Sequence, residues 1–193
     1  ALYMKENCNR LRRWSEMLIL KILGAICITG ATTLYARGLV SELTCRINAL
    51  KALRNSFSVL KGELRYGVET LPSAFMNVGE KCSVSQAAVR DFFWGVGKKL
   101  RTENGNVLKD VWEEAAKKLA ADTHLDGKEC DSLINVGNSL GYLDLTQQIN
   151  NLEIYLESVD EDIAVLSERY SDNCKMYMSL GVMAGLFLTI ILI

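Results

Sequence analysis

Residues 144–170 read DLTQQINNLEIYLESVDEDIAVLSERY, and apolar side chains recur in this stretch at alternating steps of four and three residues. Such a heptad pattern predicts a long α-helix with one apolar seam, and Asp144 is placed to cap its amino terminus. The seam can pack within the chain's own helical domain or form a coiled coil with a second copy. Packing within the domain is favoured, because a set of shorter helices needs a long partner. The seam consists of Leu145, Ile149, Leu152, Leu156, Val159, Ile163, Leu166 and Tyr170.

Five shorter helices are predicted before the long one. The single proline, Pro72, falls in the first turn of the second of them, where its missing N–H costs nothing. Gly67 is placed to end the first helix, and Gly141 to turn the chain before the last. Few alternating β-branched stretches exist, so the predicted fold class is all-α. Apolar periodicity places the five helices at residues 40–66, 71–78, 84–102, 107–121 and 126–139.

Two apolar stretches flank this helical part and are predicted to span a membrane. Residues 176–193 carry no charge, and eighteen helical residues rise about 27 Å, close to the thickness of a bilayer core. Residues 17–36 are interrupted only by Lys21, whose side chain can reach back to the headgroups. A cleaved signal peptide is the alternative for this stretch, but its length and lack of an A-x-A site favour a retained anchor. The expected organisation is a tail at 1–16, a span at 17–36, a helical domain at 37–175 and a span at 176–193.

Charge is unevenly distributed although the chain's formal net charge is −1. Residues 40–109 carry a net +5 and residues 110–175 a net −10. The basic half can face acidic partners or lipid headgroups, or the two halves can fold onto each other, which we favour slightly. No C-x-x-C pair occurs, so reduced thiols are expected rather than a disulfide framework or a zinc site. The cysteines are Cys8, Cys27, Cys45, Cys82, Cys130 and Cys174.

Catalytic motifs are missing from the sequence. The only histidine, His124, falls between two predicted helices, and no P-loop, H-E-x-x-H or G-x-S-x-G pattern occurs. Gly95 and Gly97 lie inside a predicted helix and indicate close packing rather than a dinucleotide site. We therefore expect a protein that is not an enzyme, has no catalytic residues, cofactor or metal site, and binds no nucleic acid.

Several short motifs in a fixed order resemble the stage III sporulation protein AB family of endospore-forming bacteria. They are MLILKILGA from Met17, ELRYGVETLP at residues 63–72, Leu140-Gly141 followed by Asp144 and Gln148, and a terminal span with Leu180-Gly181. The resemblance implies a six-helix antiparallel bundle similar to the helical domain of the platform protein of type II secretion and type IV pilus machines. The motif residues with expected structural roles are Tyr66, Gly67, Leu71, Pro72, Leu140, Gly141, Asp144 and Gln148, with the ring of Tyr66 buried at a helix corner.

The resemblance also implies a function. By this resemblance the chain is expected to act as a non-enzymatic membrane platform in the channel between mother cell and forespore. The platform is expected to dock a cytoplasmic secretion-type ATPase and to contact other channel components. A homo-oligomer is a further expectation, and a membrane-tethered adaptor or regulator outside any secretion machine is the alternative. The expected location is the outer forespore membrane, with the helical domain in the mother-cell cytoplasm. If translation starts at Met17, basic residues flank mainly the domain side of the spans, whereas the basic residues of the tail at 1–16 would make the balance nearly even.

Two features depart from the family pattern. Residues 1–16 precede the usual start, so Met17 is a candidate initiator. Leu143 stands where the family often has a serine before the capping aspartate.

Overall fold

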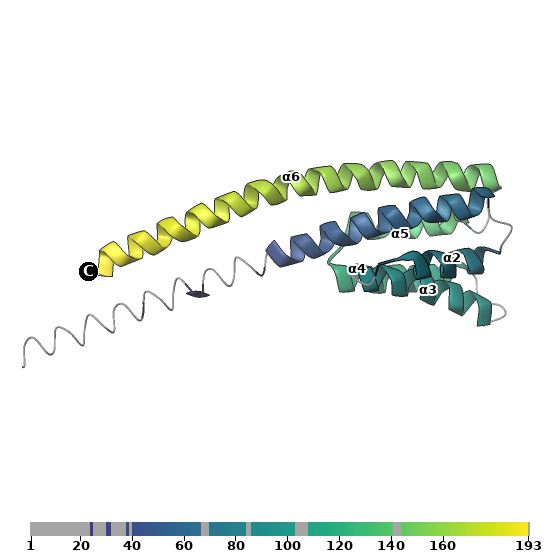
Figure 1. Cartoon of the computed structure of the whole chain (residues 1–193), viewed down its shortest axis with the longest axis horizontal. Helices are drawn as coiled ribbons and strands as arrows, with labels where there is room; N and C mark the ends of the chain where they lie inside the picture. Colours follow the sequence, from purple (N-terminus) through teal and green to yellow (C-terminus); the bar gives the residue numbers. More distant parts are fainter. Residues whose placement is uncertain are drawn as a thin grey trace, which may run out of the picture. The chain divides into compact units, whose positions relative to one another are not determined.

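The computed structural model describes residues 24, 30–31, 38, 40–66, 70–83, 86–102, 108–140 and 144–192. From residue 40 onward the described residues form six helices and no strand, which confirms the all-α prediction (Figure 1). The first helix covers residues 40–66. The others are α2 (Leu71–Lys81), α3 (Ala87–Thr102), α4 (Leu108–Thr123), α5 (Gly127–Leu140) and α6 (Leu145–Leu192).

The chain divides into two compact units. One unit is the bundle formed by Glu42–Arg169, and the other comprises Ala1–Ser41 with Tyr170–Ile193. The predicted span at 17–36 lies almost entirely outside the described residues, as do most side chains of residues 176–193. Among the helices that the structure describes, none combines the length and apolar character required to cross a bilayer.

The core of the bundle is a cluster of aromatic rings drawn from five of its helices. Phe57, on the first helix, lies 5.2 Å from Phe93 of α3 and 4.7 Å from Tyr155 of α6, measured between ring centroids. Phe75 of α2 lies 5.4 Å from Trp112 of α4. All five side chains are buried, and the tilted and edge-on arrangements are those that aromatic rings prefer. This cluster fixes how the helices face one another.

Two ion pairs show that the first helix and α6 run antiparallel. Arg54 pairs with Asp160 at 3.0 Å, and Lys61 pairs with Glu153 at 3.2 Å. The partners are seven residues apart on each helix and follow in opposite order, so the two helices are aligned along two turns. Figure 1 shows the consecutive helices of the bundle alternating in direction. The implied antiparallel arrangement is therefore confirmed for the bundle.

The apolar seam of α6 packs against the bundle's own helices, as we favoured. Its buried members are Ile149, Leu152, Val159 and Leu166, and Leu156 and Ile163 are half-buried. Leu145, at the start of the seam, is instead 48% exposed.

Glycines allow α2 and α3 to approach through their backbones. A Cβ added at Gly97 of α3 would lie 2.7 Å from the carbonyl oxygen of Pro72, and one added at Gly79 of α2 would lie 2.9 Å from Trp94 Cβ. The prediction of close packing is thus confirmed for Gly97. It is wrong for Gly95, because that position faces open space and nothing lies within 4 Å of an added Cβ.

Candidate functional site

Asp144 caps α6, as its position in the sequence predicts. Its Oδ1 accepts a hydrogen bond of 2.8 Å from the backbone N–H of Gln147. Its carbonyl oxygen accepts the first intrahelical bond, 2.9 Å from the N–H of Gln148. A side-chain cap of this kind contributes about 1 kcal/mol to helix stability. Pro72 likewise lies in the first turn of α2, as expected.

Tyr66 does not bury its ring, and the prediction of a buried corner tyrosine is wrong. Its side chain is 82% exposed at the last described residue of the first helix. The reason is helical phase: Tyr66 follows Phe57 by two and a half turns, so it points to the opposite side of the helix from that core residue. A tyrosine held in water at a helix end is available to a partner, because tyrosine is enriched at protein interfaces.

Of the other motif residues, some pack in the bundle and some lie outside the described residues. Leu140 is buried at the end of α5, and Leu71 is half-buried at the start of α2. Gly67 and Gly141 lie outside the described residues.

The motif residues gather at one end of the bundle. Continuing the register of the two ion pairs by five residues places Tyr66 level with Gln148, in the first turns of α6. We call this region the capped end and define it by four exposed residues, Tyr66, Thr70, Asp144 and Leu145. The exposure of Leu145 could not be read from the heptad pattern, which predicts only its phase on the helix. The capped end offers apolar contact and hydrogen bonding to a partner.

The most buried ion pair links the basic and acidic halves of the chain. Arg46, on the first helix, contacts Glu129 through Nε and Nη2 at 2.8 and 2.9 Å, and also pairs with Asp126. The side chain of Glu129 is only 3% exposed. The backbone N–H of each acid also donates to the other's carboxylate, at 2.9 and 3.0 Å, which forms a capping box at the start of α5. This cluster is accounted for by packing, and it supports the prediction that the two halves fold onto each other.

Electrostatics in this cluster favour the charged forms. The hydrogen bond to Glu129 raises the pKa of Arg46 against the opposing effect of burial. Burial alone would raise the pKa of Asp126, but the N–H of Glu129 and the guanidinium of Arg46 outweigh it and lower that pKa. These are the shifts of a satisfied ion pair, not of a group that exchanges protons with a substrate.

Within the part of the chain that the structure describes, no group of three histidine, cysteine or acidic side chains could hold a metal ion. Cys45, Cys82 and Cys130 are free thiols, and Cys82 Sγ lies 3.1 Å from Ser56 Oγ. His124 is exposed at the end of α4, with a left-handed φ of 57°.

Comparison with known proteins gives consistent results. The sequence model of the family described as stage III sporulation protein AB matches residues 21–193. A curated relative, stage III sporulation protein AB of Bacillus subtilis (strain 168), is 28% identical over 174 residues, which cover 90% of this chain and 99% of the relative. A solved structure of a stage III sporulation protein AB is similar with a TM-score of 0.59 and 21% identity, over 66% of this chain and 97% of that one. At this identity the structural similarity shows a shared fold only.

Proposed function

Since this chain belongs to the stage III sporulation protein AB family, we propose that it is a non-enzymatic membrane platform of the channel between mother cell and forespore. The observation that carries the proposal is the family match over residues 21–193. The helical bundle supports it, because the described residues offer exposed contact surfaces on a packed helical scaffold.

The proposal places the chain in the outer forespore membrane. Residues 176–193 without a charge, and residues 17–36 with only Lys21, are the segments that would anchor it. Basic residues on the domain side of these segments favour a bundle in the mother-cell cytoplasm. Full-length protein that stays in solution without detergent would contradict the anchors.

The partner at the capped end is proposed to be a cytoplasmic secretion-type ATPase. Tyr66 and Leu145 together expose aromatic and aliphatic surface, which suits the centre of a protein interface. The capped end is also the end of the bundle remote from residue 169, after which the chain proceeds toward the proposed C-terminal anchor. A cytoplasmic ATPase could bind this end without contacting the residues that connect the bundle to the proposed anchor.

Co-purification tests the partner and the site separately. The full-length chain is co-expressed with the sporulation secretion-type ATPase, extracted in detergent and captured by a tag. We expect wild type to retain the ATPase, and Tyr66→Ala with Leu145→Ala to lose at least about tenfold of it, since two central apolar contacts cost more than about 1.4 kcal/mol. Lys118→Ala, a truncation at an exposed position on α4, is the control and should retain it.

Two outcomes would count against this assignment. If wild type captures no ATPase, the platform role fails and the adaptor alternative gains weight. If the double variant binds as well as wild type, the ATPase meets another surface.

A further inference from the structure

The outer side of α6 combines exposed apolar and acidic side chains. Ile154 is 64% exposed and Val165 is 48% exposed, although both lie in the middle of a bundle helix. They are eleven residues apart, which is three helical turns, so they point in nearly the same direction. Three glutamates lie within the same arc of the helix and are exposed. We call this surface the acidic face: Ile154, Glu157, Glu161, Val165 and Glu168.

The glutamates of the acidic face have no ion-pair partner among the described residues, unlike three other acids of α6. Asp160 and Glu153 pair with the first helix, and Asp162 pairs with Lys128 of α5 at 3.3 Å. These three hold α6 to the bundle. The charges of the acidic face therefore contribute nothing visible to the fold and are available to an outside partner.

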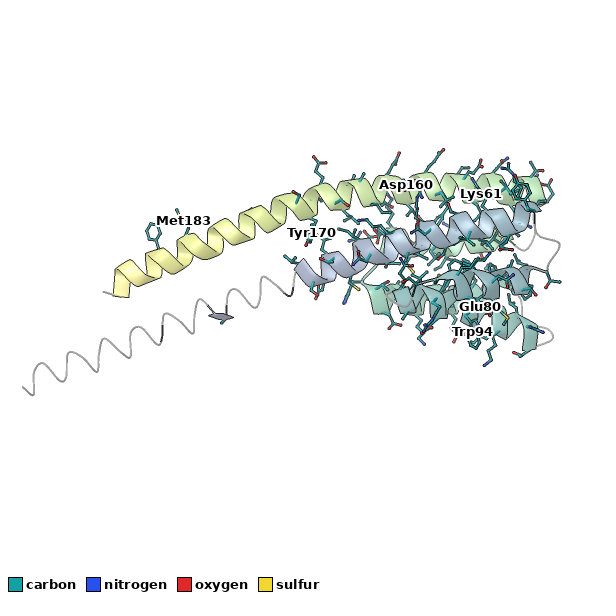
Figure 2. The ribbon with its side chains drawn as sticks, in the orientation of Figure 1. Lys61, Glu80, Trp94, Asp160, Tyr170 and Met183 are labelled. Carbon is teal, nitrogen blue, oxygen red and sulfur yellow. The ribbon has the colours of Figure 1, made fainter. Side chains whose placement is uncertain are left out.

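A complementary surface lies on α3. Trp94 is 40% exposed, and Lys98 Nζ lies 4.9 Å from the centroid of its indole ring. Arg101 is exposed one turn further, and Arg90, one turn before Trp94, pairs with its neighbour Asp91. All four project within one arc of the helix. We call this surface the basic face: Arg90, Trp94, Lys98 and Arg101. Figure 2 shows Trp94 on the side of the bundle away from α6.

The terminal charged residues of the two faces are separated by the same length of helix. Arg90 and Arg101 are eleven residues apart on α3, and Glu157 and Glu168 are eleven residues apart on α6. Each pair therefore spans about 16.5 Å of helix. If the helices lie antiparallel, Arg101 faces Glu157 and Arg90 faces Glu168.

The middle of the two faces matches in the same register. In this antiparallel alignment Lys98 lies opposite Glu161, and Trp94 lies opposite Val165. One alignment thus places three cations opposite three carboxylates and the exposed indole opposite an exposed valine. The Trp94–Val165 contact would remove apolar surface from water on both sides.

We propose that the basic face of one chain packs antiparallel against the acidic face of a second copy. Within one chain α3 and α6 run in opposite directions, since consecutive helices alternate and two helices separate them. Two copies that point the same way therefore present these helices to each other antiparallel, in the register just described. That is the orientation required of two chains held in one membrane.

The contact is heterologous, because each copy contributes a different face. The two faces lie on different sides of the bundle, so every added copy leaves one of each kind free, and the contact builds a row or a ring. A contact between two single helices is small, so its affinity in dilute solution is low. Confinement to a membrane raises the local concentration and compensates for this. The inference does not depend on the ATPase partner.

Charge-reversal variants test the contact. The full-length chain, labelled at its amino terminus with donor or acceptor dye, is placed in neutral phosphatidylcholine vesicles, and energy transfer between copies is measured. We expect transfer for wild type at low salt and less at about 0.5 M salt, where the screening length falls to a few ångströms. Glu157→Lys with Glu161→Lys, or Lys98→Glu with Arg101→Glu, should weaken apparent association at least tenfold. Lys109→Glu with Lys118→Glu on α4 reverses two exposed charges elsewhere and should leave association unchanged.

Mixing the two face variants gives the decisive result. The reversed acidic face of one variant is complementary to the reversed basic face of the other, and their unaltered faces still match, so the mixture should recover transfer. Recovery also shows that both variants are folded. Absence of self-association in wild type would overturn the proposal, as would two weak variants that fail to recover when mixed; the latter result would point to an outside partner of the opposite charge.

Discussion

Gly137 of α5 lies so close to the ring of Trp112 that an alanine there cannot be accommodated unless the ring or the helix shifts. A Cβ added at Gly137 would lie 2.1 Å from both Cδ1 and Nε1 of the indole and 2.4 Å from Cε2. Ordinary van der Waals contact begins near 3.4 Å, so the ring or the helix must move by more than 1 Å. The ring is fully buried, its centroid is 4.9 Å from that of Phe92, and Nε1 donates a 2.8 Å hydrogen bond to the carbonyl oxygen of Leu133.

The cost of Gly137→Ala follows from these contacts. Overpacking a well-filled core costs about 1–3 kcal/mol, and loss of the buried indole hydrogen bond costs about 1–2 kcal/mol. Alanine's better helix propensity returns about 1 kcal/mol. We therefore expect Gly137→Ala to lower the free energy of unfolding by about 1–4 kcal/mol, the sum of these estimates.

Urea unfolding of the full-length chain in detergent, followed by circular dichroism at 222 nm, measures the effect. Gly62→Ala is the matched control, because an added Cβ meets nothing within 4 Å inside the first helix. The control should gain about 0.5–1 kcal/mol from helix propensity alone. A Gly137→Ala protein as stable as Gly62→Ala would show that α4 and α5 do not approach through the indole, and the reasoning would fail.

Three further changes probe the ion pairs, the cap and the left-handed residue. Arg46→Ala leaves the buried carboxylate of Glu129 without its partner and should cost about 3 kcal/mol, whereas Arg54→Ala breaks an exposed, solvent-screened pair and should lower the melting temperature far less; thermal melts of the two variants should differ accordingly. Asp144→Ala removes the side-chain cap of α6 and should cost about 1 kcal/mol, whereas Asp144→Ser should restore most of the stability in the same urea assay. His124→Gly relieves a left-handed φ of 57° and should stabilise the protein by about 1 kcal/mol; a loss in the melting temperature would mean that the imidazole makes a contact that matters.

Local signals in the sequence predicted the helices well. The cap at Asp144, the proline in the first turn of α2 and the apolar periodicity are all short-range features that act within one or two turns. The first helix is described up to residue 66, the end expected for it, and α3, α4 and α5 begin one to three residues after the expected positions. Such differences are usual at helix ends, where terminal turns fray.

Burial at the helix ends could not be predicted in the same way. Leu145 belongs to the heptad seam and Tyr66 is predicted to lie at a buried helix corner, yet both side chains are exposed in the part of the chain that the structure describes. Conversely, Tyr155 lies outside the heptad seam but is buried against Phe57. Its burial raises the pKa of its phenol, and nearby Glu129 and Asp162 add to the effect. Which positions are covered depends on the arrangement of all six helices, and that arrangement is not contained in any single stretch.

The backbone contact between α2 and α3 has a consequence for the order in which the bundle assembles. The two helices are adjacent in the chain and meet at Gly79 and Gly97, so joining them closes only a short loop. The ion pair between the first helix and α6, Arg54 with Asp160, joins residues 106 positions apart, so forming it closes a long loop and costs more chain entropy. It also cannot form until α6 has left the ribosome. Until then Phe57 lacks its contact with Tyr155, and the apolar side of the first helix stays incompletely covered in the nascent chain. The earliest intermediate is therefore expected to be a hairpin of α2 and α3 that is packed at Gly79 and Gly97. The first helix and α6 pair with each other only later.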